Sequence, residues 1–413
     1  MPSEQAGQPI VLLSTDRSME ASKALPNHRV RIGYNQAMNY SAGSAGNDDP
    51  SRRDFIAGRL QQPTADTVEG ADTELASVDY LFQATRRAMA CDFQVSFDSR
   101  LYPEGPEAAL AALDVVDQLE AELSVFRDSS QVSQLNRLAA EQPVTVDTML
   151  CELLQHCLEI WKQTDGAFDI TSTPLSRAWG FFRREGRMPS NEEVEDARKA
   201  VGSQWLKVEH SNRTVHFEHP DLEINLGSIG KGFALDRCGA CLAVDVDDFI
   251  IHGGYSSILA HGNRQLASEA RNGWQIAVRH PLKPQQRLIE LTLNDCAAGT
   301  SGSANQFFSH QGKRYSHLLD PRTGWPAEEM LSATVLSSSA ADSDALATAF
   351  FVMGVQRTVQ FIKDNPQVRA VLVCSGERSG ATDVHLVGLS DDSWKLLSDT
   401  VTLIDHGTEL AGT

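Results

Sequence analysis

The sequence predicts an α+β fold, with mixed or antiparallel sheets packed against helices. Strand-like stretches come in pairs, as at residues 205–217 and 248–262. Long segments with apolar residues at helical spacing separate them, at residues 106–126 and 146–164. Because no regular strand–helix–strand repeat is present, a doubly wound parallel sheet is disfavoured.

The N-terminal segment differs in composition from the rest. Residues 1–78 are rich in Ser, Gly, Asn, Asp, Gln and Ala and show no sustained periodicity, which is typical of disordered chains. We therefore expect a disordered, low-complexity arm at 1–78, a folded domain at 79–400 and a flexible tail at 401–413. The arm holds a twin-arginine-like motif at Arg52-Arg53 with no apolar stretch after it. Localisation stays open: cytoplasmic, or periplasmic if this motif is functional.

Charge and hydropathy exclude some classes of protein. The chain has 36 Lys and Arg against 55 Asp and Glu, a formal net charge of -19. Since nucleic-acid binding needs clustered basic residues, nucleic acid is not an expected partner. No apolar run approaches the ~20 residues of a bilayer span, so no transmembrane segment is expected. The seven Cys argue against a fully paired disulfide framework, and we interpret Cys238 and Cys241 as structural.

The folded elements are expected in the following order. Residues 87–97 alternate in the manner of a strand, and the two long helices follow. A short surface helix at residues 191–201 precedes a hairpin with Asn212 near its turn. The 248–262 pair is centred on Gly253-Gly254. Further strands are expected at residues 222–226, 274–279, 288–293, 333–337, 368–374 and 384–389.

Two loops have side chains suited to a ligand. Residues 225–237 read N-L-G-S-I-G-K-G-F-A-L-D-R, where three glycines and Lys231 precede a helix. Such a backbone can approach a phosphate closely, although a tight strand-to-helix turn would need the same glycines. The loop at residues 166–181 carries aromatic and polar side chains that could stack on a flat ring or could simply pack.

A polar pair lies on the helix expected at residues 342–354. Ser339 or Asp342 can cap its start, and Gly354 can end it. Asp344 and Thr348 are four residues apart and share one face. Carboxylate and hydroxyl oxygens suit Mg²⁺, but an acidic first turn and a Thr bonded to the helix backbone would give the same pattern.

The order of these motifs resembles one family. From about residue 80 to 375 the chain is similar to the ApbE family of FAD:protein FMN transferases, which implies a T-fold-like architecture. The motifs that carry this resemblance are Met89-Ala90-Cys91, residues 126–136, 166–179 and 225–236, Gly253-Gly254, Thr300-Ser301-Gly302, the S-H-L-L-D-P-R-T-G run at 316–324 and residues 342–354.

The resemblance implies an activity and a set of site residues. It implies transfer of the FMN half of FAD to a Thr or Ser hydroxyl on an acceptor flavoprotein, with Mg²⁺ on the diphosphate and release of AMP. His317 matches the residue of the transfer step, and Ser228, Asp344 and Thr348 match the metal ligands. Asp344 is also a candidate catalytic residue. Flavin nucleotide contacts are expected from Met89, Phe126, Ala167, Phe168, Asp169, Asn225, Lys231, Thr300 and Ser301.

The chemistry of these residues agrees with such roles. A metal and Lys231 would stabilise charge on a breaking diphosphate. A hydroxyl nucleophile needs a base, for which His317 has a suitable pKa and Asp320 or Asp344 is the alternative. Where the family has Gly-Gly-Asp, this chain has Tyr255 in place of the acid. Hydrolysis of FAD to FMN and AMP, and FAD binding without catalysis, are the alternative functions.

Overall fold

A ten-stranded sheet forms the centre of the molecule. The computed structural model describes residues 31–36, 80–264, 273–304, 306–378 and 380–407. Neighbouring strands are antiparallel except for the last pair, which is parallel, so the predicted mixed α+β class is confirmed. In spatial order the strands are β1 (Arg31–Gln36), β2 (Tyr80–Ala88), β3 (Cys91–Asp98), β7 (Phe249–Gly253), β8 (Ser257–His261), β11 (Cys296–Gly302), β14 (Met330–Ser337), β15 (Arg369–Ser375), β16 (Thr382–Val387) and β18 (Thr402–Asp405).

Three small sheets accompany the large one. The first joins β17 (Trp394–Leu396), β10 (Lys283–Leu293) and β9 (Trp274–His280), and its apolar residues share a core with strands β7 to β16 of the large sheet. The second is the hairpin of β12 (Phe307–His310) and β13 (Lys313–Ser316). The third joins β4 (Val144–Thr145), β6 (Thr214–Phe217) and β5 (Leu206–Glu209). The last pair is the predicted 205–217 hairpin.

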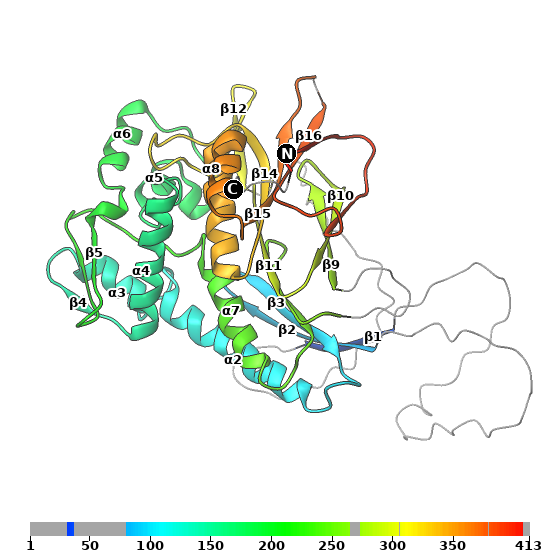
Figure 1. The fold of residues 1–413 in the computed structure, drawn as a ribbon. Coiled ribbons are helices and arrows are strands. Elements are labelled where there is room, and N and C mark those ends of the chain that lie inside the picture. The colour runs from blue at the N-terminus through cyan, green and yellow to red at the C-terminus, as the bar shows by residue number, and fades with distance from the viewer. Residues whose placement is uncertain (1–30, 37–79, 265–272, 305, 379, 408–413) are drawn as a thin grey trace, which may run out of the picture.

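Helices cover one face of the large sheet and form a lobe beside it (Figure 1). The two that matter most for the site, α7 (Gly230–Leu242) and α8 (Ala340–Asp364), pack against each other, and α8 also lies on β11 and β14. The others are α2 (Gly105–Leu123), α3 (Gln131–Leu138), α4 (Thr148–Gln163), α5 (Thr173–Ala178) and α6 (Asn191–Lys199), with single 3₁₀ turns at Phe181–Arg183 and Ser203–Trp205.

The structure corrects three predicted elements. Residues 222–226, expected as a strand, form no regular secondary structure. The strand expected at residues 87–97 is interrupted by a tight turn, because Met89 and Ala90 have φ of 48° and 61°, in the left-handed region. Alternating apolar residues continue through the turn, so periodicity alone did not reveal it. Gly354 does end a helix, with φ of 79°, but a second helical segment continues at once to Asp364.

Two described strands lie in segments that we expected to lack structure. Arg31–Gln36 pairs with β2 inside the expected arm, and Thr402–Asp405 pairs with β16 inside the expected tail. The Arg52-Arg53 motif lies outside the described residues. Among the described helices, α8 alone is long and apolar enough to cross a membrane, and more than half of its most apolar window is buried inside the fold, as in a core helix.

Candidate active site

The start of α8 is fixed to α7 through Asp236. Its carboxylate accepts hydrogen bonds from Ser339 Oγ at 2.8 Å and from the N–H groups of Ala340 and Ala341 at 2.7 and 2.9 Å. Ser339 in turn accepts from the N–H of Asp342 at 3.2 Å, so Ser339 is the N-cap of the two candidates. This anchor sets where the polar side chains of the next turn lie.

Asp344 is buried in that turn and is surrounded by donors. Ser257 Oγ donates to Oδ1 at 2.7 Å and lies 2.9 Å from Oδ2. The N–H of Gly232 donates to Oδ2 at 2.8 Å, and Lys231 Nζ lies 3.7 Å from the same oxygen. Burial raises the pKa of Asp344, while the Lys231 ammonium, the Ser257 hydroxyl and the Gly232 N–H oppose this rise. The protein itself therefore solvates this carboxylate.

Two glycines allow α8 to approach its neighbours. A Cβ on Gly232 would lie 2.0 Å from the carbonyl oxygen of Ala340, and one on Gly299 would lie 2.4 Å from the backbone of Ser343. No other residue fits at either position without displacing a backbone. One glycine of the predicted phosphate loop is thus required for helix packing, and its N–H is thereby brought to Asp344.

Thr348 faces β11 from the next turn of α8. Its Oγ1 lies 3.1 Å from Ser301 Oγ and 3.4 Å from the carbonyl oxygen of Asp344. Thr300 Oγ1 instead lies 2.9 Å from Thr334 Oγ1 on β14. Since neighbouring strand residues point to opposite faces, Ser301 belongs to the Asp344 side of the sheet and Thr300 does not. The structure therefore separates two residues that we expected to act together.

The remaining candidates near α7 belong to turns. Ser228 lies in the turn that leads into α7, one residue before the N-cap Ile229. The side chain of Asn225 accepts from the N–H of Gly227 at 2.9 Å and so shapes this turn. Met89 lies at the β2–β3 turn, where its N–H donates to Glu120 Oε1 at 2.8 Å.

The loop at residues 166–169 is largely internal. The side chains of Ala167 and Phe168 are buried. Burial raises the pKa of Asp169, whose carboxylate accepts from the hydroxyl and N–H groups of Thr171 and Ser203, at 2.7 to 3.1 Å. The side chains of Phe168 and Asp169 therefore pack inside the protein and hold the loop in shape.

Phe126, unlike the largely buried loop at residues 166–169, lies on the protein surface. Its side chain is 72% exposed, and its ring centroid lies 5.3 Å from that of Phe182. The guanidinium of Arg177 lies 4.0 Å above the Phe182 ring and bonds to Glu223 at 2.9 and 3.0 Å. Phe126 thus presents a supported aromatic face on which a flat ring could stack.

His317 lies after β13, with its ring oriented by the backbone. Nδ1 is 3.0 Å from the carbonyl oxygen of Gln306, and the ring meets Phe181 edge-on at 6.4 Å. Because a carbonyl only accepts, Nδ1 carries the proton and Nε2 keeps a lone pair. Burial lowers the pKa of His317, against the Gln306 contact, so the neutral ring is favoured. Asp320, the alternative base, is engaged by Arg322 at 2.8 and 2.9 Å.

Sequence reasoning missed two residues of this site. Ser257 and Asp236 hold Asp344 and the start of α8, respectively. A Ser at the start of a strand and an Asp inside a helix are common, so neither position carried a signal; their roles depend on the packing of α7 against α8. Within the described ranges, no cluster of three or more His, Cys, Asp or Glu side chains is placed to hold a metal.

The comparison with known families decides the relationship. The sequence model of the ApbE family matches residues 89–372, most of the chain. The chain belongs to the ApbE family. The resemblance inferred from the motifs is thereby confirmed.

Individual ApbE relatives agree with this assignment. The FAD:protein FMN transferase of Treponema pallidum is 29% identical over 68% of this chain and 83% of its own length, and that of Vibrio cholerae is 30% identical over 61% and 75%. The flavinyl transferase ApbE of Pseudomonas stutzeri superposes with a TM-score of 0.66, at 26% identity, over 76% of this chain and 98% of its own. An ApbE protein from Thermotoga maritima gives 0.64, at 26% identity, over 73% and 96%.

Proposed function

We propose that this protein is a Mg²⁺-dependent FAD:protein FMN transferase that moves FMN to a Thr or Ser hydroxyl of an acceptor flavoprotein and releases AMP. The single observation that carries the proposal is the buried Asp344, flanked by Lys231 and followed one turn later by Thr348. A buried carboxylate with an ammonium group and hydroxyl groups beside it can hold the metal ion that a diphosphate substrate requires. Membership of the ApbE family supports the same function.

The donor set fits a hard cation. Asp344 Oδ1 accepts from Ser257 only, as far as the described residues go, so it keeps lone pairs for a further bond. Asp344, Thr348 and an oxygen at Ser228 would hold Mg²⁺, with the FAD diphosphate and water as the other ligands. When bound, the ion would polarise the diphosphate oxygens.

Lys231 and Ser301 would act on the substrate directly. Lys231 lies where its ammonium can stabilise negative charge on the phosphate oxygens as the diphosphate breaks. Ser301 lies beside Thr348 and can donate its hydroxyl to the same oxygens. Phe126 would stack on a ring of FAD, and the turns at Met89 and Asn225 and the backbone of residues 167–169 would line the nucleotide.

His317 would act as the base. In the transfer, the acceptor hydroxyl oxygen forms a bond to the FMN phosphorus, the bond from that phosphorus to the AMP oxygen breaks, and the hydroxyl proton moves to His317 Nε2. The favoured neutral state and the fixed Nδ1 proton leave Nε2 ready to accept it. Asp320 is less suited, because Arg322 holds its carboxylate.

One incubation tests the proposal. The purified protein is mixed with FAD, Mg²⁺ and a candidate acceptor flavoprotein, and products are separated by mass. Flavin covalently attached to the acceptor, with equimolar AMP, is the expected result. Free FMN with AMP would mean FAD hydrolysis, and unchanged bound FAD would mean a binding protein without catalysis; either outcome would replace the proposal.

A further inference from the structure

One cavity of the protein is lined by neither Asp344 nor its partners Ser257 and Lys231. It has a volume of about 450 Å³, within the usual range for small-molecule pockets. It lies between the end of α4, the end of α6 and the loop after β13. Its polar lining includes Trp161, Lys162, Asp165, Asp169, Arg198 and Arg322. Neither Lys231 nor His317 lines it, so the residues proposed for the transfer step lie elsewhere; of the expected flavin contacts, Asp169 alone lines this cavity.

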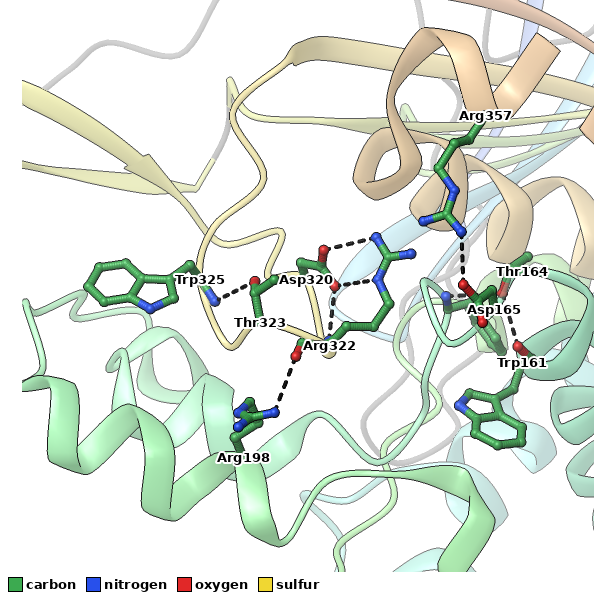
Figure 2. Close-up of polar contacts among 10 residues, drawn as sticks. Trp161, Thr164, Asp165, Arg198, Asp320, Arg322, Thr323, Trp325 and Arg357 are labelled. Atoms are coloured by element: carbon green, nitrogen blue, oxygen red, sulfur yellow. Dashed lines mark hydrogen bonds and ion pairs between the residues drawn. The ribbon is translucent and has the colours of Figure 1, made fainter. Parts of the chain in front are cut away.

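The acidic side chains of this cavity already have partners. Asp165 pairs with Arg357 of α8 at 2.8 Å, as Figure 2 shows. Asp169 is held by the hydroxyl and N–H groups of Thr171 and Ser203. Neither carboxylate needs a cation from outside, so the cavity does not resemble a metal site.

Several donors of the cavity, by contrast, have no acceptor within the described part of the chain. The Trp161 indole N–H and the Lys162 ammonium have none. Arg322 uses Nε and Nη2 on Asp320, which locks its guanidinium plane, and Nη1 is left buried without an acceptor (Figure 2). Arg198 has one donor on Glu195 at 2.9 Å, and its Nη1 makes only a long contact, 3.4 Å to the carbonyl oxygen of Arg322. The cavity thus offers donors and positive charge.

The helix dipoles explain only part of this arrangement. Lys162 and Arg198 lie in the last turns of α4 and α6, where basic residues are favoured. That accounts for their charge. Arg198 also pairs through Nη2 with Glu195 at 2.9 Å, so among these two residues only the Lys162 ammonium is without an acceptor within the described residues. The Arg322 side chain comes from a loop, so no helix end explains it. Three basic side chains from three separate segments meet at one cavity in a chain with a net charge of -19.

We propose that this cavity binds the phosphate group of a small phosphomonoester. Arginine and lysine donors form strong charge-assisted hydrogen bonds to phosphate oxygens. The volume leaves room for a small organic group beside the phosphate, next to the indole of Trp161. The proposal is independent of the flavin transfer and needs no activity for its test.

Calorimetric titration of the full chain tests it, in chloride buffer of constant ionic strength. Inorganic phosphate and glycerol phosphate are the probes. We expect saturable binding that weakens about tenfold in Lys162→Gln and in Arg198→Gln. Lys199→Gln is the matched control, because Lys199 is exposed on α6 and pairs with Asp196 away from the cavity. Tighter binding of glycerol phosphate would identify an organic phosphate as the ligand, and equal binding would identify the free ion.

Two results would overturn the proposal. The first is an absence of saturation with both probes, or equal weakening in the Lys199→Gln control, which would mean a general charge effect. The second is loss of binding in Lys231→Gln, which would place the phosphate at the flavin site. Flavin transfer can fail or succeed without changing either result, so the two proposals are tested separately.

Discussion

Ser257 donates its hydroxyl to Asp344 at 2.7 Å, and both side chains are buried. The two residues lie 87 positions apart and meet because β8 and α8 are both packed against α7. A serine at the start of a strand thus supports the carboxylate that we propose as a metal ligand. This contact leads to the first prediction.

Removing the Ser257 hydroxyl is expected to weaken both the fold and the site. In Ser257→Ala the buried carboxylate loses a donor, which costs about 1–3 kcal/mol of unfolding free energy. FAD affinity in the presence of Mg²⁺ should fall about tenfold, the equivalent of about 1.4 kcal/mol. Urea denaturation and FAD titration measure the two effects. Ser256→Ala is the control, since the structure gives Ser256 no contact with Asp344; equal losses in both variants would contradict the role of Ser257.

The close approach of α7 and α8 gives a second prediction. Gly232→Ala should destabilise the protein by about 1–3 kcal/mol or more, because the new Cβ would overlap the Ala340 carbonyl group. Gly230→Ala in the same helix meets nothing closer than 3.9 Å. There the stability should hold or rise by about 0.4–1 kcal/mol, as the unfolded chain loses freedom. Thermal unfolding of the pair measures this difference, and similar melting temperatures would refute it.

Local sequence patterns predicted most elements of this fold, because the periodicity of apolar residues and the residues at turns and helix ends lie within each element itself. The stripe of α2, the 205–217 hairpin and the end of a helix at Gly354 all follow from neighbouring residues. The β2–β3 turn was missed because Met89 and Ala90 are not residues that favour positive φ. Contacts between residues far apart in the sequence leave no comparable local pattern.

For the candidate site, the sequence indicated the residues but not all of their positions in space. Motif order correctly indicated the family, and the structure brings Lys231, Asp344, Thr348 and Ser301 together. The face on which Thr300 lies depends on the strand register of β11, which the local sequence does not specify.

Ligand-dependent stability gives a third prediction. With Mg²⁺ and FAD at about 100 times their dissociation constant, the wild type should gain about 2.7 kcal/mol of unfolding free energy, and a chelator should reverse the part due to the ion. Asp344→Asn should lose that response, since an amide is a poor ligand for Mg²⁺. Asp342→Asn is the matched control, because Asp342 bonds to His156 at 2.6 Å instead of to the Asp344 cluster. An unchanged Mg²⁺ response in Asp344→Asn would exclude Asp344 as a ligand.

The pH dependence of transfer gives the fourth prediction. Burial lowers the pKa of His317, so the rate should stay constant as the pH falls through about 6.5, the ordinary value, and should drop only at the lower pKa of the folded protein. His317→Gln should reduce transfer about 10²- to 10⁴-fold and leave FAD binding unchanged.

The lowered pKa of His317 also affects the free energy of unfolding. Below about pH 6.5 the unfolded state takes up the proton more readily than the folded state, so stability falls as the pH falls toward the lowered pKa.

The His317→Gln variant tests the role of His317 through both the stability and the transfer rate. His317→Gln should remove this part of the acid sensitivity of unfolding, while His156→Gln should not, because Asp342 raises the pKa of His156. Rate profiles and denaturation curves between pH 5 and pH 8 provide both readouts. An inflection that persists in the residual rate of His317→Gln would assign the base to another group. Asp320 would then be the next candidate, and its release from Arg322 would be required first.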